Sequence, residues 1–369
     1  MNPITTTQVN VKRDEMPAER LRIAVIGAGY WGPNLARNFA QSPDWDLAAV
    51  CDLDVERARA VADRVGAPFA SSLDEVLDDP TIHAIAIATP ARAHGEIATA
   101  ALGKGKHVVV EKPLADSRGI GVEMCDAAER NGLVLMADHT YCYTPAVLKI
   151  RELIELGEIG EILYIDSVRI NLGLIQPDVD VLWDLAPHDL SILDFILPDG
   201  LDMSEVCAVG SDPLNTGKAC VGYLTLPLGS GGIAHVHVNW LSPTKIRRMV
   251  IAGSLRTIVW DDLNPQQRIS IYDRGIDLDT QSRTEANVTP ATVSYRLGSM
   301  WAPALAEQEA LANMATEFAS AIRGRRAART SGGSGLRVLS VLEAAAQSLA
   351  RGGMPVAVEH EVPELETVL

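Results

Sequence analysis

Asp184 and His188 are the residues in this sequence whose types and spacing best suit proton transfer. They stand in the segment from Trp183 to Asp189, where the pattern predicts the start of a helix, so the two side chains share one face. A carboxylate beside an imidazole can orient the ring and keep its pKa near working pH, as a general base requires. The alternative is structural, with Asp184 as a helix N-cap and His188 packed at a domain seam. A nucleotide site elsewhere would favour catalysis, because hydride removal from a carbinol needs a group that takes the hydroxyl proton.

A glycine-rich motif near the start of the chain supplies that nucleotide signal. The segment GAGYWG, residues 27–32, matches G-x-G-x-x-G, follows an apolar stretch and precedes a helical one. Gly27 permits a tight turn, Gly29 lets the backbone approach a pyrophosphate, and Gly32 allows a helix to pack closely on a strand. Free N–H groups at the start of the helix favour bound phosphates. The residues predicted to contact a dinucleotide here are Gly27, Gly29, Tyr30, Trp31 and Gly32.

Asp52 indicates which dinucleotide the motif binds. It ends the second apolar stretch, twenty residues beyond Gly32. A carboxylate at this place accepts hydrogen bonds from the ribose hydroxyls and repels a 2′-phosphate. Arg57 and Arg59 are close enough in sequence to weaken this preference. The predicted cofactor is therefore NAD rather than NADP.

Lys112 follows directly on the apolar stretch Val108–Val110, within the tripeptide Glu-Lys-Pro. Ligands of open α/β sheets bind beyond the carboxyl ends of the strands, so Lys112 is expected to face the cofactor. A solvated surface lysine is the alternative. Thr-Pro at residues 89–90 ends another stretch at the same edge, with a histidine one turn further on. Cofactor contacts are accordingly predicted for Thr89, Pro90, His94, Glu111 and Lys112.

Further residues are candidates for contact with a substrate. His139 and Tyr141 follow the sixth apolar stretch and are therefore expected near the cleft. Lys245, Arg247 and Arg248 could meet an anionic group, although a solvated strand face explains them equally well. Of this group, Tyr141 and Lys245 are predicted to bind substrate.

His235 and His237 are the one histidine pair with the spacing of a strand-borne metal site. Residues two apart on a strand share a face, so both rings could reach one ion. The sequence offers no third ligand nearby, and sheet packing or a subunit contact explains the pair better. No metal site is predicted.

The elements that must position these residues alternate between strand and helix up to about residue 140. Near-continuous apolar runs suit strands buried on both faces of a parallel sheet, and the alternation predicts a doubly wound α/β domain. Strands are expected at Leu21–Ile26, Asp46–Cys51, Ala67–Ala70, His83–Ala88, Lys106–Val110 and Leu133–Ala137. Helices are expected at Pro33–Gln41, Val55–Val65, Ala93–Gly103 and Ser117–Asn131.

The pattern changes near residues 140–145, where strands begin to follow one another without helices between them. This predicts a second α/β domain with a mostly antiparallel sheet. Its strands are expected at Glu161–Leu172, Ala219–Leu226, Gly232–Trp240, Lys245–Ala252, Arg256–Asp261 and Arg268–Asp273. Its helices are expected at Pro145–Leu156, Asp184–Leu197, Ala304–Arg323 and Gly335–Ala350. The predicted organisation is a loose tail at 1–20, a cofactor domain at 21–142, and a substrate-binding and oligomerisation domain at 143–369.

Composition excludes several classes of partner. The 369 residues include 48 acidic and 32 basic side chains, for a net charge of −16, which argues against nucleic acid and an anionic membrane surface. No apolar run reaches the roughly 18 residues of a membrane-spanning helix. The five cysteines are odd in number and scattered, which suits reduced thiols and a cytoplasmic location.

The motifs together resemble the Gfo/Idh/MocA oxidoreductase family. The resemblance rests on the glycine motif, the Ala-Thr-Pro at 88–90, the Glu-Lys-Pro at 111–113 and the Asp184–His188 pair, and extends from residue 21 to about 358. It implies a Rossmann domain followed by a domain with a large open sheet, often used for oligomer contacts, and hence a dimer or tetramer. Inositol dehydrogenases of this family carry a trio that maps onto Lys112, Asp184 and His188. By this likeness His188 takes the hydroxyl proton, Asp184 orients it and binds substrate, and Lys112 polarises the reacting oxygen.

Several segments look most like the nucleotide-sugar 3-dehydrogenases of that family. They are residues 29–32, 171–173, 182–192, 240–247 and 271–273, and they place Asn171 among the substrate contacts. The likeness implies NAD-dependent oxidation of a secondary sugar hydroxyl, at C3, to a ketone, ahead of transamination as in antibiotic pathways. The sugar would be nucleotide-linked or part of an aminoglycoside. Lys245 and Arg247 suit a diphosphate, whereas the acids Asp178, Asp180, Asp184 and Asp189 suit a polycationic aminosugar.

Three other functions stay open at this point. One is an inositol 2-dehydrogenase-like activity. Another is an NAD-dependent glycosidase that is redox-neutral overall. The third is a sensor that binds NAD without turnover, against which the intact trio Lys112, Asp184 and His188 argues.

Overall fold

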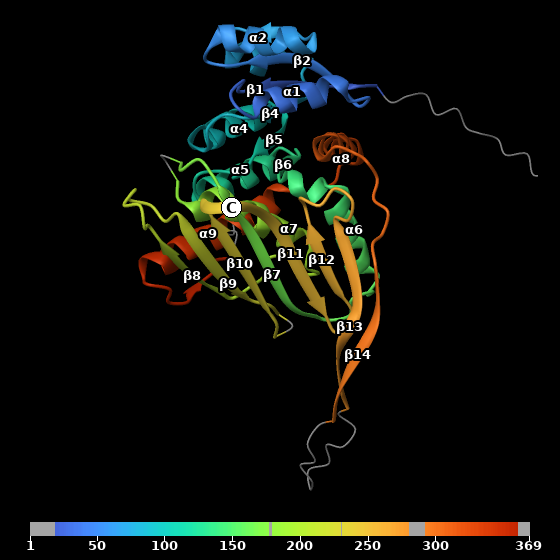
Figure 1. Cartoon of the computed structure of the whole chain (residues 1–369). Helices are drawn as coiled ribbons and strands as arrows, with labels where there is room; N and C mark the ends of the chain where they lie inside the picture. The colour runs from blue at the N-terminus through green and yellow to red at the C-terminus, as the bar shows by residue number, and fades with distance from the viewer. Residues whose placement is uncertain (1–18, 177–178, 230, 280–291, 361–369) are drawn as a thin grey trace, which may run out of the picture.

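The computed structural model describes residues 19–176, 179–229, 231–279 and 292–360, and its first part is a six-stranded parallel sheet (Figure 1). The strand order is β3-β2-β1-β4-β5-β6, so strands β2 and β3 are added on one side of β1 and strands β4 to β6 on the other. The strands are β1 (Leu21–Ile26), β2 (Trp45–Cys51), β3 (Phe69–Ala70), β4 (Ala84–Ile87), β5 (His107–Glu111) and β6 (Leu135–Asp138). The helices are α1 (Gly32–Gln41), α2 (Val55–Val65), α3 (Leu73–Asp78), α4 (His94–Gly103) and α5 (Arg118–Arg130). The predicted doubly wound domain is confirmed, and all but two residues of the predicted loose tail lie outside the described residues.

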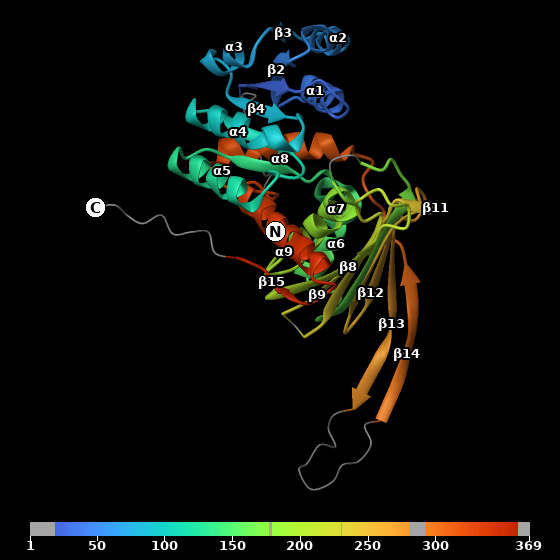
Figure 2. The same cartoon turned by 90° about the vertical axis from the view of Figure 1, so that its left-hand side faces the viewer.

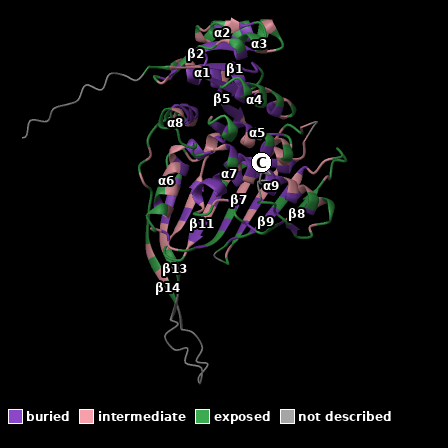
Figure 3. Ribbon diagram, turned by 180° about the vertical axis from the view of Figure 1, so that it is seen from behind, coloured by how far each residue is buried: buried purple, intermediate pink, exposed green. Residues whose placement is uncertain are grey.

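The central strands β1, β4 and β5 are largely buried, as their apolar sequences require (Figure 3). β4 reads AIAI and all four of its residues are inaccessible. The connections follow local rules: Asp54 caps α2 by accepting a hydrogen bond from the Arg57 amide at 3.1 Å, and Gly66 ends that helix with a φ of +70°. Such short connections bring the strand ends to one edge, where a ligand can bind.

The second sheet has nine strands in the order β14-β13-β12-β11-β7-β10-β9-β8-β15. Its one parallel pair among the described pairs joins β7 to β10, so the predicted, mostly antiparallel sheet is confirmed. The strands are β7 (Ile162–Leu172), β8 (Glu205–Ser211), β9 (Val221–Pro227), β10 (Ile233–Asn239), β11 (Leu241–Gly253), β12 (Thr257–Asp261), β13 (Ile269–Asp279), β14 (Thr292–Trp301) and β15 (Val356–Ala357). The helices are α6 (Pro145–Glu155), α7 (Val181–Ile196), α8 (Ala310–Gly324) and α9 (Gly332–Ala350).

Helices α6, α7 and α9 lie on one face of this sheet (Figure 2). In β10 the inward residues Ala234, Val236 and Val238 are fully buried, whereas His235 and His237 face the other side and are partly exposed. Strands of this alternating kind have one face in the core and one face that the described helices leave uncovered.

The C-terminal helices return to the first domain. The loop before α9 pairs with the edge strand β6, where the Ala137 amide donates to the Thr330 carbonyl at 2.8 Å and the Thr330 hydroxyl donates to the Ala137 carbonyl at 2.7 Å. The Arg118 amide at the start of α5 donates to Glu343 of α9 at 2.6 Å. The two sheets are therefore joined by main-chain and side-chain bonds as well as by apolar packing.

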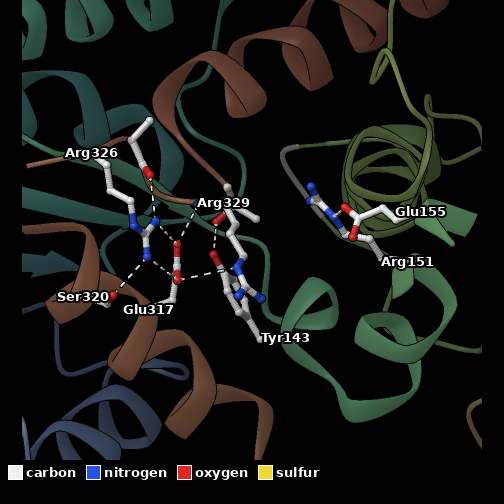
Figure 4. Close-up of polar contacts among 9 residues, drawn as sticks. Tyr143, Arg151, Glu155, Glu317, Ser320, Arg326 and Arg329 are labelled. Atoms are coloured by element: carbon white, nitrogen blue, oxygen red, sulfur yellow. Dashed lines mark hydrogen bonds and ion pairs between the residues drawn. The ribbon is translucent and has the colours of Figure 1, made fainter. Parts of the chain in front are cut away.

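A buried carboxylate fixes the turn between α8 and α9 (Figure 4). Glu317 accepts two hydrogen bonds from the Arg326 guanidinium, at 2.7 and 3.0 Å, and one from the Arg329 amide at 3.0 Å. Arg326 also reaches the Ser320 hydroxyl at 3.0 Å. These bonds hold the helix ends on either side of the turn and so set where α9 meets β6.

Several boundaries differ from the sequence prediction. Helix α7 begins at Val181 with Asp180 as its N-cap, so Asp184 lies inside the helix and is not its cap. Helix α8 begins at Ala310 rather than Ala304, because Glu309 stays extended while its carboxylate binds Arg37 at 2.9 Å. Strands β8 and β14 were not predicted: each has exposed positions and a glycine, which weakens its apolar pattern.

Among the described residues, no helix is both long enough and apolar enough to cross a membrane.

Candidate active site

The glycine motif adopts the geometry that a bound dinucleotide needs. Gly27 has a φ of +97°, and a Cβ there would lie 2.6 Å from the Ala88 carbonyl oxygen. At Gly32 a Cβ would collide with the Gly27 carbonyl, so α1 packs directly on the turn. Gly29 has open space around it, and no side chain caps the start of α1. Free amides beside open space fit a pyrophosphate. Tyr30, 95% exposed, stacks on Trp31 at the rim of this space.

Asp52 lies beside this turn, at the end of β2. Its carboxylate accepts the Ala28 amide at 2.7 Å and the Asp54 amide at 2.8 Å, so the backbone fixes its orientation. Arg57 lies 3.4 Å from Asp52 and 3.1 Å from Asp54, and is therefore engaged by carboxylates instead of being free to receive a 2′-phosphate. This arrangement is compatible with the ribose role predicted for Asp52, which stays a prediction.

Lys112 and Asp184 meet across the domain boundary. The Lys112 ammonium donates to the Asp184 backbone carbonyl at 3.2 Å and lies 3.7 Å from its carboxylate oxygen Oδ1. Both side chains remain about one-fifth exposed. The other carboxylate oxygen accepts a hydrogen bond from the Trp240 indole at 3.0 Å. The end of β5 and the first turn of α7 are therefore brought together, as the sequence predicted for two of its three catalytic candidates.

His188 lies one helical turn further on and is held by different neighbours. The Tyr141 ring meets it edge-on at 5.1 Å, and no hydrogen bond or ion pair joins His188 to the Asp184 carboxylate in the described part of the chain. Burial, and then the positive charges of Lys112, Arg169 and Arg247 and the neighbouring His139, lower the pKa of His188 well below its ordinary value. The imidazole is consequently neutral.

The ion pair between Arg169 and Asp189, which the sequence did not predict, lies against Tyr141. Arg169 of β7 and Asp189 of α7 bind at 2.7 Å with both side chains at most 3% exposed. The Ser167 hydroxyl donates to the same carboxylate at 2.8 Å. The Arg169 guanidinium lies 4.4 Å from the centre of the Tyr141 ring. The available signal was an arginine at an inward position of a strand, which requires a buried partner.

Two carboxyl groups lie side by side beneath Lys112. Glu111 and Asp138 are paired in register at the ends of β5 and β6, and the Trp31 indole lies 3.4 Å from Asp138. Burial, with the charge of Asp138, raises the pKa of Glu111 well above its ordinary value, and burial raises that of Asp138 to about 6. Ionisation of both carboxyl groups is therefore disfavoured, and one Glu111 oxygen has no hydrogen-bond partner.

The remaining candidates have more limited geometry. His94 is 1% exposed, and its ring nitrogens lie 2.9 and 2.8 Å from the carbonyls of Pro113 and Thr89, so it holds those loops rather than pointing to open space. The Thr89 hydroxyl is buried without a partner, and Pro90 is exposed beside it. Asn171 lies at the end of β7 close to Gly173, and Lys245 is exposed on β11.

The acids that suited a polycationic sugar are mostly occupied. Asp180 caps α7 by accepting the amides of Leu182 and Trp183 at 2.9 and 3.0 Å, and Asp189 is paired with Arg169. Asp178 lies outside the described residues. The described residues contain no group of three or more His, Cys, Asp or Glu that could hold a metal ion.

Two family models match most of the chain. The oxidoreductase family, NAD-binding Rossmann fold model matches residues 21–139, and the GFO/IDH/MocA C-terminal domain model matches residues 147–259. The chain therefore belongs to the Gfo/Idh/MocA oxidoreductase family, and its first domain binds NAD.

Individual relatives agree with this assignment. An uncharacterised oxidoreductase of Streptococcus pneumoniae is 35% identical over 159 residues, which is 43% of each chain. The UDP-N-acetylglucosamine 3-dehydrogenase of Acidithiobacillus ferrooxidans is 29% identical over 323 residues, covering 87% of this chain and 94% of that protein. Its structure superposes with a TM-score of 0.75 at 26% identity, over 90% of this chain and 99% of that one. GenD2 from gentamicin A biosynthesis, solved in complex with NAD, gives a TM-score of 0.75 at 25% identity over 95% and 99%.

Proposed function

We propose that this oxidoreductase oxidises a secondary hydroxyl of a sugar, at C3, to a ketone and transfers the hydride to NAD. The observation that carries the proposal is the approach of Lys112 to Asp184, 3.7 Å apart, at the edge where the cofactor domain ends its strands, with His188 one turn further along α7. NAD, when bound, supplies the hydride acceptor. The names of the relatives, a UDP-sugar 3-dehydrogenase and an antibiotic-pathway protein, support a sugar substrate.

Each residue of the trio has a separate task in the proposed reaction. Neutral His188 accepts the proton of the reacting hydroxyl as the C–H bond gives up its hydride. Lys112 donates a hydrogen bond to the oxygen that becomes the carbonyl and stabilises negative charge on it. Asp184 accepts a hydrogen bond from a neighbouring sugar hydroxyl and so fixes the ring. The products are a keto-sugar, NADH and one proton.

The charge around the site favours a nucleotide-linked sugar over an aminoglycoside. Arg247 lies 5.7 Å from the Tyr141 ring centre, is about one-third exposed, and its nearest carboxylate is Asp262 at 3.5 Å. Asp180 and Asp189 are occupied within the fold. Lys245 on the same strand is exposed, so a diphosphate finds a cation there, whereas a polycation finds few free acids.

A substrate panel tests the reaction directly. The chain is incubated with NAD and a UDP-sugar, a free sugar, an inositol or an aminoglycoside, and NADH is followed by its absorbance. We expect NADH to form with the UDP-sugar. Release of sugar from a glycoside without net NADH would favour the redox-neutral glycosidase, and NADH from inositol alone would favour an inositol dehydrogenase.

Variants test the assignment of the trio. Lys112→Ala and His188→Ala should each lower kcat by roughly 10²- to 10⁴-fold while NAD binding persists. Lys104→Ala is the matched control, since Lys104 is a surface lysine paired with Asp78 at 2.7 Å. Unchanged turnover in both site variants would refute the assignment.

The uncovered face of the large sheet is the proposed subunit contact, which would make the protein a dimer or tetramer. On this face the Tyr223 ring stacks between His235 and His237, at 5.8 and 4.3 Å. Tyr164 and Ile233 add exposed apolar surface, at 40% and 48% exposure. Mass measured by light scattering tests the proposal, and a Tyr223→Asp variant should shift the protein towards monomer.

A further inference from the structure

We infer that Trp240 is a positioning residue, whose indole N–H fixes the Asp184 carboxylate in the orientation that binds the sugar. The inference rests on the proposed function, because it takes Asp184 as a substrate contact. Trp240 connects β10 to β11 and is 1% exposed, so it does not itself reach the substrate.

The backbone holds the Trp240 ring in place. Its amide donates to the Cys220 carbonyl at 3.0 Å, and its carbonyl accepts the Gly173 amide at 2.9 Å. A Cβ at Gly173 would lie 3.1 Å from the indole, so the glycine leaves only the space that the ring needs. A buried ring packed in this way presents its single N–H donor in one direction.

The indole N–H points to the Asp184 carboxylate, whose two oxygens contact residues of different domains. Oδ2 accepts the Trp240 indole at 3.0 Å, from the large sheet, while Oδ1 lies 3.7 Å from Lys112, at the end of β5. The carboxylate cannot rotate without losing one of these contacts. Each oxygen can accept more than one hydrogen bond, so lone pairs remain for sugar hydroxyls. A preorganised acceptor of this kind lowers the cost of orienting the substrate.

Trp45 provides a matched control for loss of a buried indole bond. It is fully buried in the cofactor domain, and its indole donates to the Ala315 carbonyl at 2.8 Å. Trp45 begins β2, at the end of the strand opposite to Asp52. Trp240→Phe and Trp45→Phe both keep an aromatic ring and lose one hydrogen bond, but only Trp240→Phe releases a site residue.

The experiment compares these variants in the full-length protein with NAD and the sugar that the wild type oxidises. Trp240→Phe should lower kcat/KM for the sugar roughly ten- to a hundredfold, as expected for loss of a hydrogen bond to a charged group, with the Kd for NAD unchanged by calorimetry. Trp45→Phe should change neither value. Equal kinetics in the two variants would overturn the inference.

A double-mutant cycle separates positioning from packing. If Trp240 acts through the carboxylate, adding Trp240→Phe to Asp184→Ala, which leaves the indole without its acceptor, should change kcat/KM by less than about twofold. Additive losses would mean that Trp240 affects the site by another route, and would also overturn the inference. Should Trp240→Phe fail to fold, Trp240→Met, whose flexible apolar side chain also lacks the N–H donor, takes its place in the same cycle. A wild type that forms no NADH from any sugar would refute the proposed function itself.

Discussion

The Tyr141 ring stands edge-on to His188, with centroids 5.1 Å apart and planes inclined by 72°. On its other side the ring receives the Arg169 guanidinium, which Asp189 holds by a buried ion pair. His188 is therefore oriented by Tyr141, in the turn after β6, and by the Arg169–Asp189 pair of β7 and α7 behind that ring. The Asp184 carboxylate, four positions before His188, does not orient it. This arrangement leads to a first prediction, about the Tyr141 ring.

Tyr141→Leu should lower kcat by roughly tenfold, because His188 loses the ring that fixes its orientation. Tyr141→Phe retains the ring and should keep kcat, while the KM for the sugar rises if the hydroxyl binds substrate. Steady-state kinetics on both variants checks the difference. An equal fall of kcat in both would show that the hydroxyl takes part in the chemistry.

The pH dependence of turnover should report the lowered pKa of His188. Besides Asp184 on its own helix, the groups that face it are Lys112, Arg169, Arg247 and His139. Because the base must be neutral, the acidic limb of the kcat/KM profile should lie well below pH 6.5.

Arg247→Gln removes a positive charge and so makes protonation of His188 easier. The acidic limb should therefore move upward, by a few tenths of a unit to about one unit. Arg248→Gln is the control, because adjacent strand residues face opposite sides. A limb that stays in place in Arg247→Gln would contradict the electrostatic cause.

Asp52→Ala should weaken NAD binding by about tenfold or more, because the lost carboxylate contacts the ribose of NAD. NADP binding should change little, because the same carboxylate repels the 2′-phosphate of NADP. Calorimetric titration of both cofactors measures the ratio. Asp46→Ala, an exposed acid of the same strand, is the control. Equal losses for the two cofactors would refute the ribose role.

Breaking the Arg169–Asp189 pair on one side should destabilise the fold strongly. Asp189→Asn leaves a buried guanidinium without its counter-charge and should cost about 3–5 kcal/mol in the free energy of unfolding. The double variant Arg169→Met with Asp189→Leu should cost much less, since no charge is left buried. Urea unfolding measures both, and a milder effect in the single variant than in the double one would contradict this account.

The cofactor half of the site could be predicted from the sequence because its signals are local. The glycine motif lies between an apolar run and a helix, and Asp52 follows at the next strand end. These residues are close together in the chain, so backbone geometry fixes where they lie. Lys112 was predicted for the same reason, since it ends a buried strand. Boundaries failed where a distant contact decided them, as at Glu309, whose carboxylate binds Arg37 of α1.

The sequence by itself thus determined the NAD-binding fold, and the strand edge and the three polar residues at which the chemistry is proposed. Only the tertiary structure decided how those residues are held. The partners of Asp184 and His188, namely Trp240 and Tyr141, lie far from them in sequence and arrive through the packing of the second sheet on α7 and the turn after β6. Contacts between these packed elements place the two side chains. The spacing of two residues on a helix fixes only that they share a face, and so it does not specify such contacts.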